Sequence, residues 1–153
     1  MPYKRLLVPL DESATAQRGL GEAMALARAL GSTVVLLHAV ELAPMLPEVA
    51  TAEAWEAIRE GLKASGERVL EEATKRVRAA GVACEAVLHE ADAGRPADTI
   101  VAEATARRCD LIVMGTHGRR GIGRALLGSD AELVLRQSPV PVLLVRGEGK
   151  AAG

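Results

Sequence analysis

The chain has 153 residues and a formal net charge of -1, and 49% of its residues are hydrophobic while only 1% are aromatic. This length provides for a single domain with one hydrophobic core. The balanced charge and the shortage of aromatic side chains argue against nucleic acid or an anionic membrane surface as a direct partner.

The sequence lacks the features of a secreted or membrane protein. No apolar run approaches the ~18 residues that span a bilayer, and the N-terminal segment lacks the apolar core of a signal peptide. Cys84 and Cys109 are isolated, so they indicate neither a disulfide framework nor a zinc motif. We expect a cytoplasmic protein with no membrane contact.

Apolar runs of strand length alternate with segments of helical period. In chain order the pattern predicts strand 4–10, helix 13–30, strand 33–40, helix 51–80, strand 82–89, helix 96–107, strand 110–115, helix 129–137 and strand 140–146. Such alternation is typical of an α/β fold, in which helices cover both faces of a parallel sheet. Continuous apolar runs at 34–37 and 111–114 indicate central strands that are buried on both faces.

The segment after the second predicted strand and the single tryptophan each allow a ligand-binding and a structural interpretation. Residues 41–50 contain Pro44 and Pro47 and cannot be regular helix, so they form either a lid on a ligand site or a plain connecting loop. Trp55 lies on the apolar stripe of helix 51–80 and is predicted to pack in the core or an interface rather than to stack on a ligand.

The last strand is predicted to lie at the edge of the sheet. Pro139 and Pro141 at its start cannot donate to a neighbouring strand, while residues 142–145 are entirely apolar. Because a bare apolar edge invites pairing, we predict a homodimer formed through Val140 to Val145. The domain is expected to cover residues 1–146, followed by a flexible tail over 147–153.

Glycines in a fixed pattern follow the strand at 110–115. The pattern reads Gly115-Thr116-His117-Gly118, nine further residues, and then Gly128-Ser129. Glycine lets a backbone approach an anion closely, and a Gly-Ser step at the start of a helix directs free N–H groups to the same place. The spacing therefore predicts a phosphate-binding loop.

This pattern resembles the nucleotide-binding signature of the universal stress protein family, Gly-x2-Gly-x9-Gly-Ser/Thr, and all of its defining positions match. Residues 4–13, 110–115 and 138–145 also resemble the family's first, fourth and last strands. The resemblance implies an open five-stranded parallel sheet of order 3-2-1-4-5, similar to adenine-nucleotide α-hydrolases. It also implies a nucleotide crevice between strands one and four, and dimers that pair through the last strand.

The resemblance and the chemistry of the residues together predict an ATP site, with or without Mg2+. The resemblance implies that Pro9 and Val40 contact the base, Val40 through its backbone. Asp11 is suited to accept hydrogen bonds from ribose or to hold a metal through phosphate, with a helix cap as the alternative. The candidate nucleotide-binding residues are Pro9, Leu10, Asp11, Val40, Met114, Gly115, His117, Gly118, Arg119, Gly128, Ser129 and Asp130.

Several of these residues have purely structural alternatives. Gly115 also suits a tight strand exit, Ser129 a helix N-cap, and His117 an anchor for its own turn. Arg119, with Arg120 and Arg124 in the same loop, is suited to clamp phosphates but equally to form a solvated basic loop.

Asp130 departs from the family's pattern, which has a small or apolar residue at this position. A carboxylate in the first turn suits the helix dipole without any ligand. It would repel a triphosphate unless Mg2+ lay between them.

Other chemistries fit less well. The chain has no Gly-x4-Gly-Lys run of a P-loop, and a phosphoacceptor receiver domain would need an aspartate and a lysine that are missing after strands three and five. His38, His89 and His117 lack companions at metal-ligand spacing. There is also no recognisable set of nucleophile, base and orienting residue.

We therefore expect a dimeric ATP-binding stress-response or regulatory protein with no catalytic residues and at most slow hydrolysis. Its protein partner is not identifiable from sequence. The alternative is a dimeric interaction scaffold of the same fold that binds no nucleotide.

Overall fold

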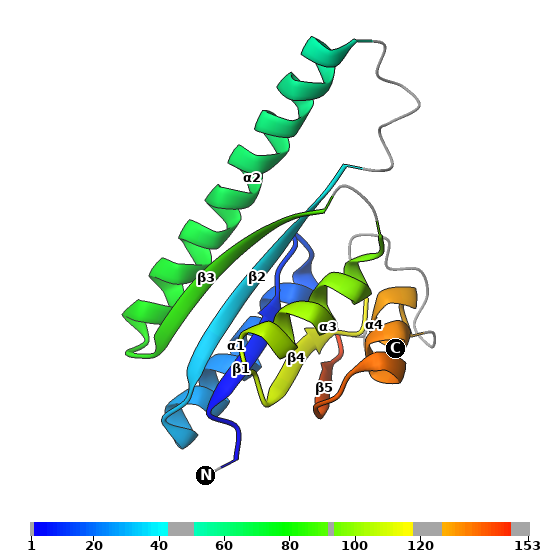
Figure 1. Cartoon of the computed structure of the whole chain (residues 1–153). Helices are drawn as coiled ribbons and strands as arrows, with labels where there is room; N and C mark the ends of the chain where they lie inside the picture. Colours follow the sequence, from blue (N-terminus) through cyan, green and yellow to red (C-terminus); the bar gives the residue numbers. More distant parts are fainter. Residues whose placement is uncertain (1, 43–50, 92–93, 118–126, 148–153) are drawn as a thin grey trace, which may run out of the picture.

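The computed structural model describes residues 2–42, 51–91, 94–117 and 127–147, which form a parallel sheet with helices on both faces (Figure 1). The ends of the predicted elements differ from the observed ones by at most two residues. The elements are β1 (Arg5–Pro9), α1 (Ala14–Leu30), β2 (Thr33–Glu41), α2 (Ala52–Ala79), β3 (Ala83–Ala91), α3 (Pro96–Ala106), β4 (Leu111–Gly115), α4 (Ser129–Gln137) and β5 (Val142–Val145).

The five strands lie in the order β3-β2-β1-β4-β5, and every neighbouring pair is parallel. This confirms the order that the family resemblance implied. β1 is central, with Leu7 opposite Val35 of β2 on one side and Ile112 of β4 on the other. The winding of the chain reverses between β1 and β4, which is where ligands bind in sheets of this kind.

The central strands are buried on both faces, as their continuous apolar runs predicted. Leu6 and Val8 of β1 belong to the core under α1 and α2. Leu7, between them, belongs to the core under α3 and α4. Adjacent residues of a strand point to opposite faces, so a strand covered on both sides needs an apolar residue at each position.

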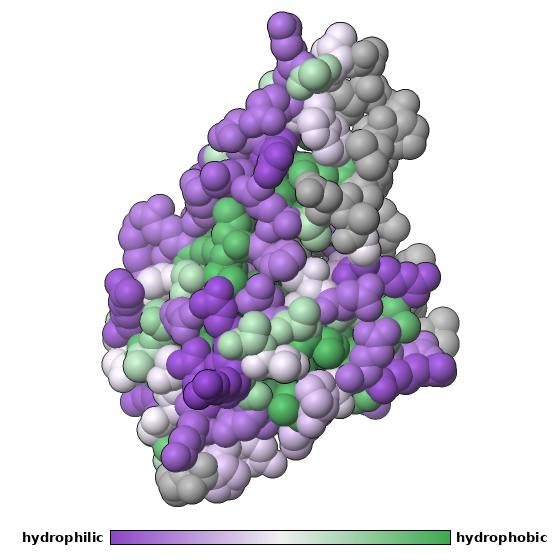
Figure 2. Space-filling model, viewed as in Figure 1, coloured by the Kyte–Doolittle hydropathy of each residue, from purple (hydrophilic) through white to green (hydrophobic). Residues whose placement is uncertain are grey.

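The long helix α2 is buried in its C-terminal half. Ala73 and Val77 are buried there, whereas Trp55, Ile58 and Leu62 are partly exposed in the half that extends beyond the other helices in Figure 1. The predicted apolar stripe is therefore core only in part. Hydrophilic side chains cover most of the outer surface of α2 in Figure 2. Among the described helices, none has the length and hydropathy of a membrane span.

Candidate functional site

A cleft of about 980 Å3 opens at the carboxyl ends of β1, β2 and β4. Ten of the twelve candidate residues line it, and the other two, Gly118 and Arg119, lie outside the described residues, as does most of the lid candidate at 41–50. The ten are Pro9, Leu10, Asp11, Val40, Met114, Gly115, His117, Gly128, Ser129 and Asp130.

The turn after β1 that contains Asp11 and Glu12, here called the acidic turn, is held by local hydrogen bonds. Asp11 Oδ1 accepts a hydrogen bond from the backbone N–H of Ser13 at 2.8 Å, and Ser13 Oγ accepts one from the N–H of Ala16 at 3.2 Å. Ser13 is thus the N-cap of α1, and the cap alternative for Asp11 is wrong. Within the described part of the chain Asp11 Oδ2 has no hydrogen-bond partner, so it is available to a ribose hydroxyl or a cation.

The loop between Gly115 and Ser129, here called the glycine loop, has its two ends joined by a hydrogen bond. The N–H of Gly128 donates to the carbonyl oxygen of Thr116 at 2.8 Å, and the N–H of Thr116 donates to Val145 of β5 at 3.0 Å. The hydroxyl of Thr15 in α1 donates to the carbonyl oxygen of His117. The base of the loop is therefore held by β5, α1 and its own other end, whatever the path of residues 118–126.

Gly115 and Gly128 are glycines for reasons of space. A Cβ atom on Gly115 would lie 2.8 Å from the Cβ of Thr15, and one on Gly128 would lie 2.9 Å from the carbonyl oxygen of Thr116. Neither distance is tolerated between real atoms. Packing alone thus requires both glycines, which fits the strand-exit alternative for Gly115 and is compatible with a phosphate approaching the same backbone.

Helix α4 begins at the cleft without a side-chain cap. Gly128 occupies the N-cap position and Ser129 is the first helical residue, so the N-cap alternative for Ser129 is wrong. The first N–H groups of a helix have no partner within the helix, and together with the positive end of the helix dipole they favour an anion at this point. Asp130 and Glu132 lie in the first turn and already supply negative charge there.

The described side chains that line the cleft are more acidic than basic. The carboxylates are those of Asp11, Glu12, Glu41 and Asp130, whereas Arg95, directly before α3, is the sole lysine or arginine that lines the cleft within the described ranges. Sequence reasoning missed Arg95, although its place before Pro96 at a helix start was a usable signal. Phosphate binding would have to draw on backbone N–H groups, Arg95, a bound cation, or the arginines at 119, 120 and 124.

His38 and Thr15 are two further residues that sequence reasoning missed. His38 lies on the floor of the cleft, 6% exposed, and its Nδ1 lies 2.9 Å from the carbonyl oxygen of Leu10. The sequence suggested it only as one of three scattered histidines. In the described ranges, no three His, Cys, Asp or Glu side chains are grouped to hold a metal ion.

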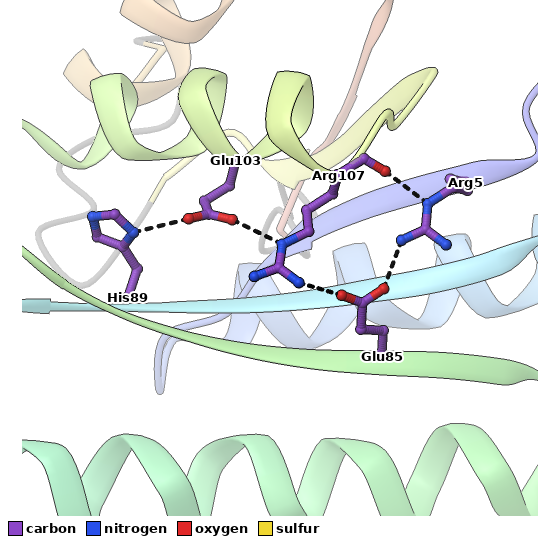
Figure 3. A network of polar contacts seen from close by, with 5 residues as sticks. All are labelled: Arg5, Glu85, His89, Glu103 and Arg107. Atoms are coloured by element: carbon purple, nitrogen blue, oxygen red, sulfur yellow. Dashed lines mark hydrogen bonds and ion pairs between the residues drawn. The ribbon is translucent and has the colours of Figure 1, made fainter.

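A separate polar network joins β1, β3 and α3 (Figure 3). The carboxylate of Glu85 pairs with Arg5 at 2.6 Å and with Arg107 at 2.5 Å, and Glu103 bridges Arg107 and His89. The hydrogen bond from Arg5 holds the pKa of Glu85 below its ordinary value, and Arg107 adds to this effect. None of these five residues lines the cleft, so the network stabilises the fold beside the site.

The thiol of Cys109 is buried beside this network. Burial raises the pKa of Cys109 to about 11, so the thiolate is scarce at neutral pH. Neither Cys109 nor Cys84 is in a disulfide. Neither cysteine lines the cleft, and thiol chemistry does not contribute to the site.

The family model and the similar proteins all point to the same family, that of the universal stress proteins. A sequence model of the universal stress protein family matches residues 2–146 of the chain. Universal stress protein MJ0531 of Methanocaldococcus jannaschii is 35% identical over 144 residues, which cover 94% of this chain and 82% of that protein. A universal stress protein of Thermus aquaticus is 39% identical over 155 residues, covering 94% and 99% of the two chains.

Solved structures of similar proteins have the same fold as this chain. Protein MJ0577 has a TM-score of 0.86 to this chain at 28% identity, with 98% of this chain and 100% of that chain covered. A universal stress protein in complex with cAMP has a TM-score of 0.69 at 26% identity, with 97% and 100% covered.

Proposed function

The chain belongs to the universal stress protein family, and on this premise we propose that it is a homodimeric, cytoplasmic ATP-binding protein with a regulatory role in stress. Nucleotide occupancy orders the loop between Gly115 and Ser129 and so alters a surface that a protein partner recognises. Hydrolysis is slow or absent.

One observation carries the proposal. One cleft is lined by residues that lie far apart in the sequence. They are Asp11 after β1 and, at the two ends of the glycine loop, Gly115, Gly128 and Ser129. A carboxylate oxygen suited to ribose and a helix start without a side-chain cap, suited to phosphate, thus face a single ligand site. The structure of a family member in complex with cAMP supports an adenine nucleotide as that ligand.

Mg2+ fits the acidic character of the cleft. Asp11 and Asp130 are oxygen donors of the kind that Mg2+ accepts alongside phosphate oxygens. A cation between Asp130 and the phosphates would remove the repulsion that the carboxylate otherwise causes. We therefore propose that ATP binds as its magnesium complex.

The dimer is proposed to form through β5. This strand is at the edge of the sheet, and Leu143 on it is 38% exposed, although it is a large hydrophobic residue. Pairing with a second copy would cover both the apolar side chain and the unpaired backbone of the edge. The free thiols of Cys84 and Cys109 support a reducing compartment such as the cytoplasm.

Isothermal titration calorimetry with ATP, with and without Mg2+, tests the nucleotide site on protein stripped of bound nucleotide. We expect saturable binding in the micromolar range that is lost in Gly118→Val. Gly121→Val is the matched control, since it changes a glycine of the same loop outside the signature, and it should retain binding.

The second candidate is a scaffold of the same fold that binds no nucleotide. Asp130 in the first turn of α4 and the acidic cleft favour it. It would be supported if no heat of binding appears up to millimolar ATP while the protein remains a folded dimer.

A further inference from the structure

We propose that His38 is a positioning residue of the cleft, which acts from β2 on the carbonyl of Leu10 and thereby sets the turn that presents Asp11. The inference rests on the proposed function, because it concerns the same nucleotide site. His38 would not touch the chemistry of the ligand; it would act through Asp11.

The hydrogen bond of His38 is well defined. Its Nδ1 is 2.9 Å from the carbonyl oxygen of Leu10, and since a carbonyl can only accept, Nδ1 carries the proton. The N–H of Leu10 donates to the carbonyl oxygen of Leu37 at 2.7 Å. Both backbone groups of Leu10 are therefore held by consecutive residues of β2.

The bond from His38 matters because β1 ends at Pro9 and the N–H of Leu10 makes the last backbone bond to β2, so the carbonyl of Leu10 lies beyond the sheet ladder. Asp11 follows immediately, and its Oδ1 is held from the other side by the N–H of Ser13 at 2.8 Å. The acidic turn is thus fixed at two points, His38 before it and Ser13 after it. Loss of the first point would leave the direction of Asp11 Oδ2 to the second alone.

Helix α2 packs against the imidazole at Gly66. A Cβ atom on Gly66 would lie 2.6 Å from Cδ2 of His38, 3.1 Å from its Nε2 and 2.8 Å from Cδ1 of Leu88. The ring therefore packs directly against the helix at Gly66, and any larger residue at this position would displace it. Glycine weakens a helix interior, and this contact is a reason for one at position 66. Gly61 is the other glycine of α2, and a Cβ atom built on it has nothing within 4 Å.

Two substitutions at His38 separate positioning from bulk. His38→Asn places an amide nitrogen near the position of Nδ1 and retains the donor, whereas His38→Leu removes it. In His38→Leu we expect ATP affinity to fall about tenfold, the effect of losing one hydrogen bond to a buried carbonyl. His38→Asn should bind within about threefold of the unsubstituted protein.

A readout without nucleotide tests the same inference directly. The Ser13 amide should exchange with solvent faster in His38→Leu than in the unsubstituted protein, measured by NMR on the ligand-free chain, and His38→Asn should restore its protection. In a background of Asp11→Ala, His38→Leu should cause little further loss of ATP affinity, because it acts through Asp11.

Gly66→Ala tests the contact between α2 and His38 by changing the helix residue instead of the histidine. The added methyl must displace the ring, so the variant should reproduce both effects of His38→Leu, while Gly61→Ala should reproduce neither. Unchanged Ser13 exchange together with unchanged ATP affinity in folded His38→Leu would overturn the inference. So would full additivity with Asp11→Ala. If the unsubstituted protein binds no ATP but the exchange results are as expected, the proposed function fails and the positioning role stands.

Discussion

The side-chain hydroxyl of Thr15, in the first turn of α1, donates a hydrogen bond to the backbone carbonyl of His117, where the glycine loop leaves the sheet. The same side chain fills the space beside Gly115. Thr15 thus links the helix that follows the acidic turn to the loop that is proposed to bind phosphate.

Thr15→Val keeps the shape of the side chain and removes this donor. We expect the free energy of unfolding to fall by about 1 kcal/mol and ATP affinity to fall about threefold to tenfold, the range for one hydrogen bond. Urea denaturation and calorimetry measure the two effects. Thr105→Val is the control, since Thr105 Oγ1 donates within α3, to the carbonyl oxygen of Val101 at 3.1 Å, and makes no other hydrogen bond to the described residues. An equal loss of ATP affinity in both variants would contradict the link.

Gly115→Ala should destabilise the fold. The new methyl would lie 2.8 Å from the Cβ and 3.0 Å from the backbone carbon of Thr15, so α1 must shift away from β4. Overpacking of this kind costs about 1–3 kcal/mol. Gly61→Ala, at an open helix position, should instead stabilise by up to about 1 kcal/mol. Urea midpoints that are equal for the two variants would refute this account of Gly115.

Glu85→Gln should destabilise the protein in a pH-dependent way. Because the Arg5 hydrogen bond lowers the pKa of Glu85 from its ordinary 4.5, the ionised carboxylate stabilises the folded state above that pH. This contribution is lost as the pH falls through the lower pKa of the folded state. We expect a difference of about 0.5–1 kcal/mol at neutral pH, limited by solvent screening, that vanishes in acid.

The matched control for Glu85 is Glu71→Gln, which removes a pair with Lys75 whose side chains are 65% and 73% exposed. Thermal melts of both variants between neutral and acidic pH make the comparison. Identical pH profiles for the two variants would show that the Glu85 network contributes no more than an ordinary surface pair.

Leu143→Lys should convert the proposed dimer to a monomer. A charge on the exposed face of β5 would have to be buried by a partner strand, which is strongly unfavourable. Leu135→Lys is the control, because Leu135 is 44% exposed but lies on α4. Sedimentation velocity should give a monomer for the first variant and a dimer for the second. A dimer in both would refute pairing through β5.

Asp130→Asn should tighten ATP binding when Mg2+ is chelated. One negative charge at a helix start is worth up to about 1 kcal/mol, or about fivefold in affinity. With Mg2+ present the gain should disappear, since the cation uses the carboxylate. Glu132→Gln is the control, because Glu132 shares the first turn but pairs with Arg136 at 2.7 Å outside the cleft. No change in either buffer would remove Asp130 from the phosphate site.

Much of the fold was predictable from short stretches of sequence. The apolar runs at 34–37 and 111–114 identified central strands, and Pro139 and Pro141 identified β5 as an edge. The strand order came from the family resemblance and not from these patterns. The spacing of Gly115 and Gly128 also indicated the loop, although each residue by itself had a structural explanation.

The contacts between residues far apart in the sequence are visible only in the folded chain. His38 and Leu10 are 28 residues apart and Thr15 and His117 are 102 apart, and neither pair has a sequence signal. Periodicity and turn residues report the local path of the chain, because helix and strand geometry repeat every few residues. Contacts across the sheet depend on strand register and on how closely a helix packs, as Gly66 packs on His38. Local patterns in the sequence thus specify the elements and the glycine loop, whereas packing between distant elements holds the cleft in shape.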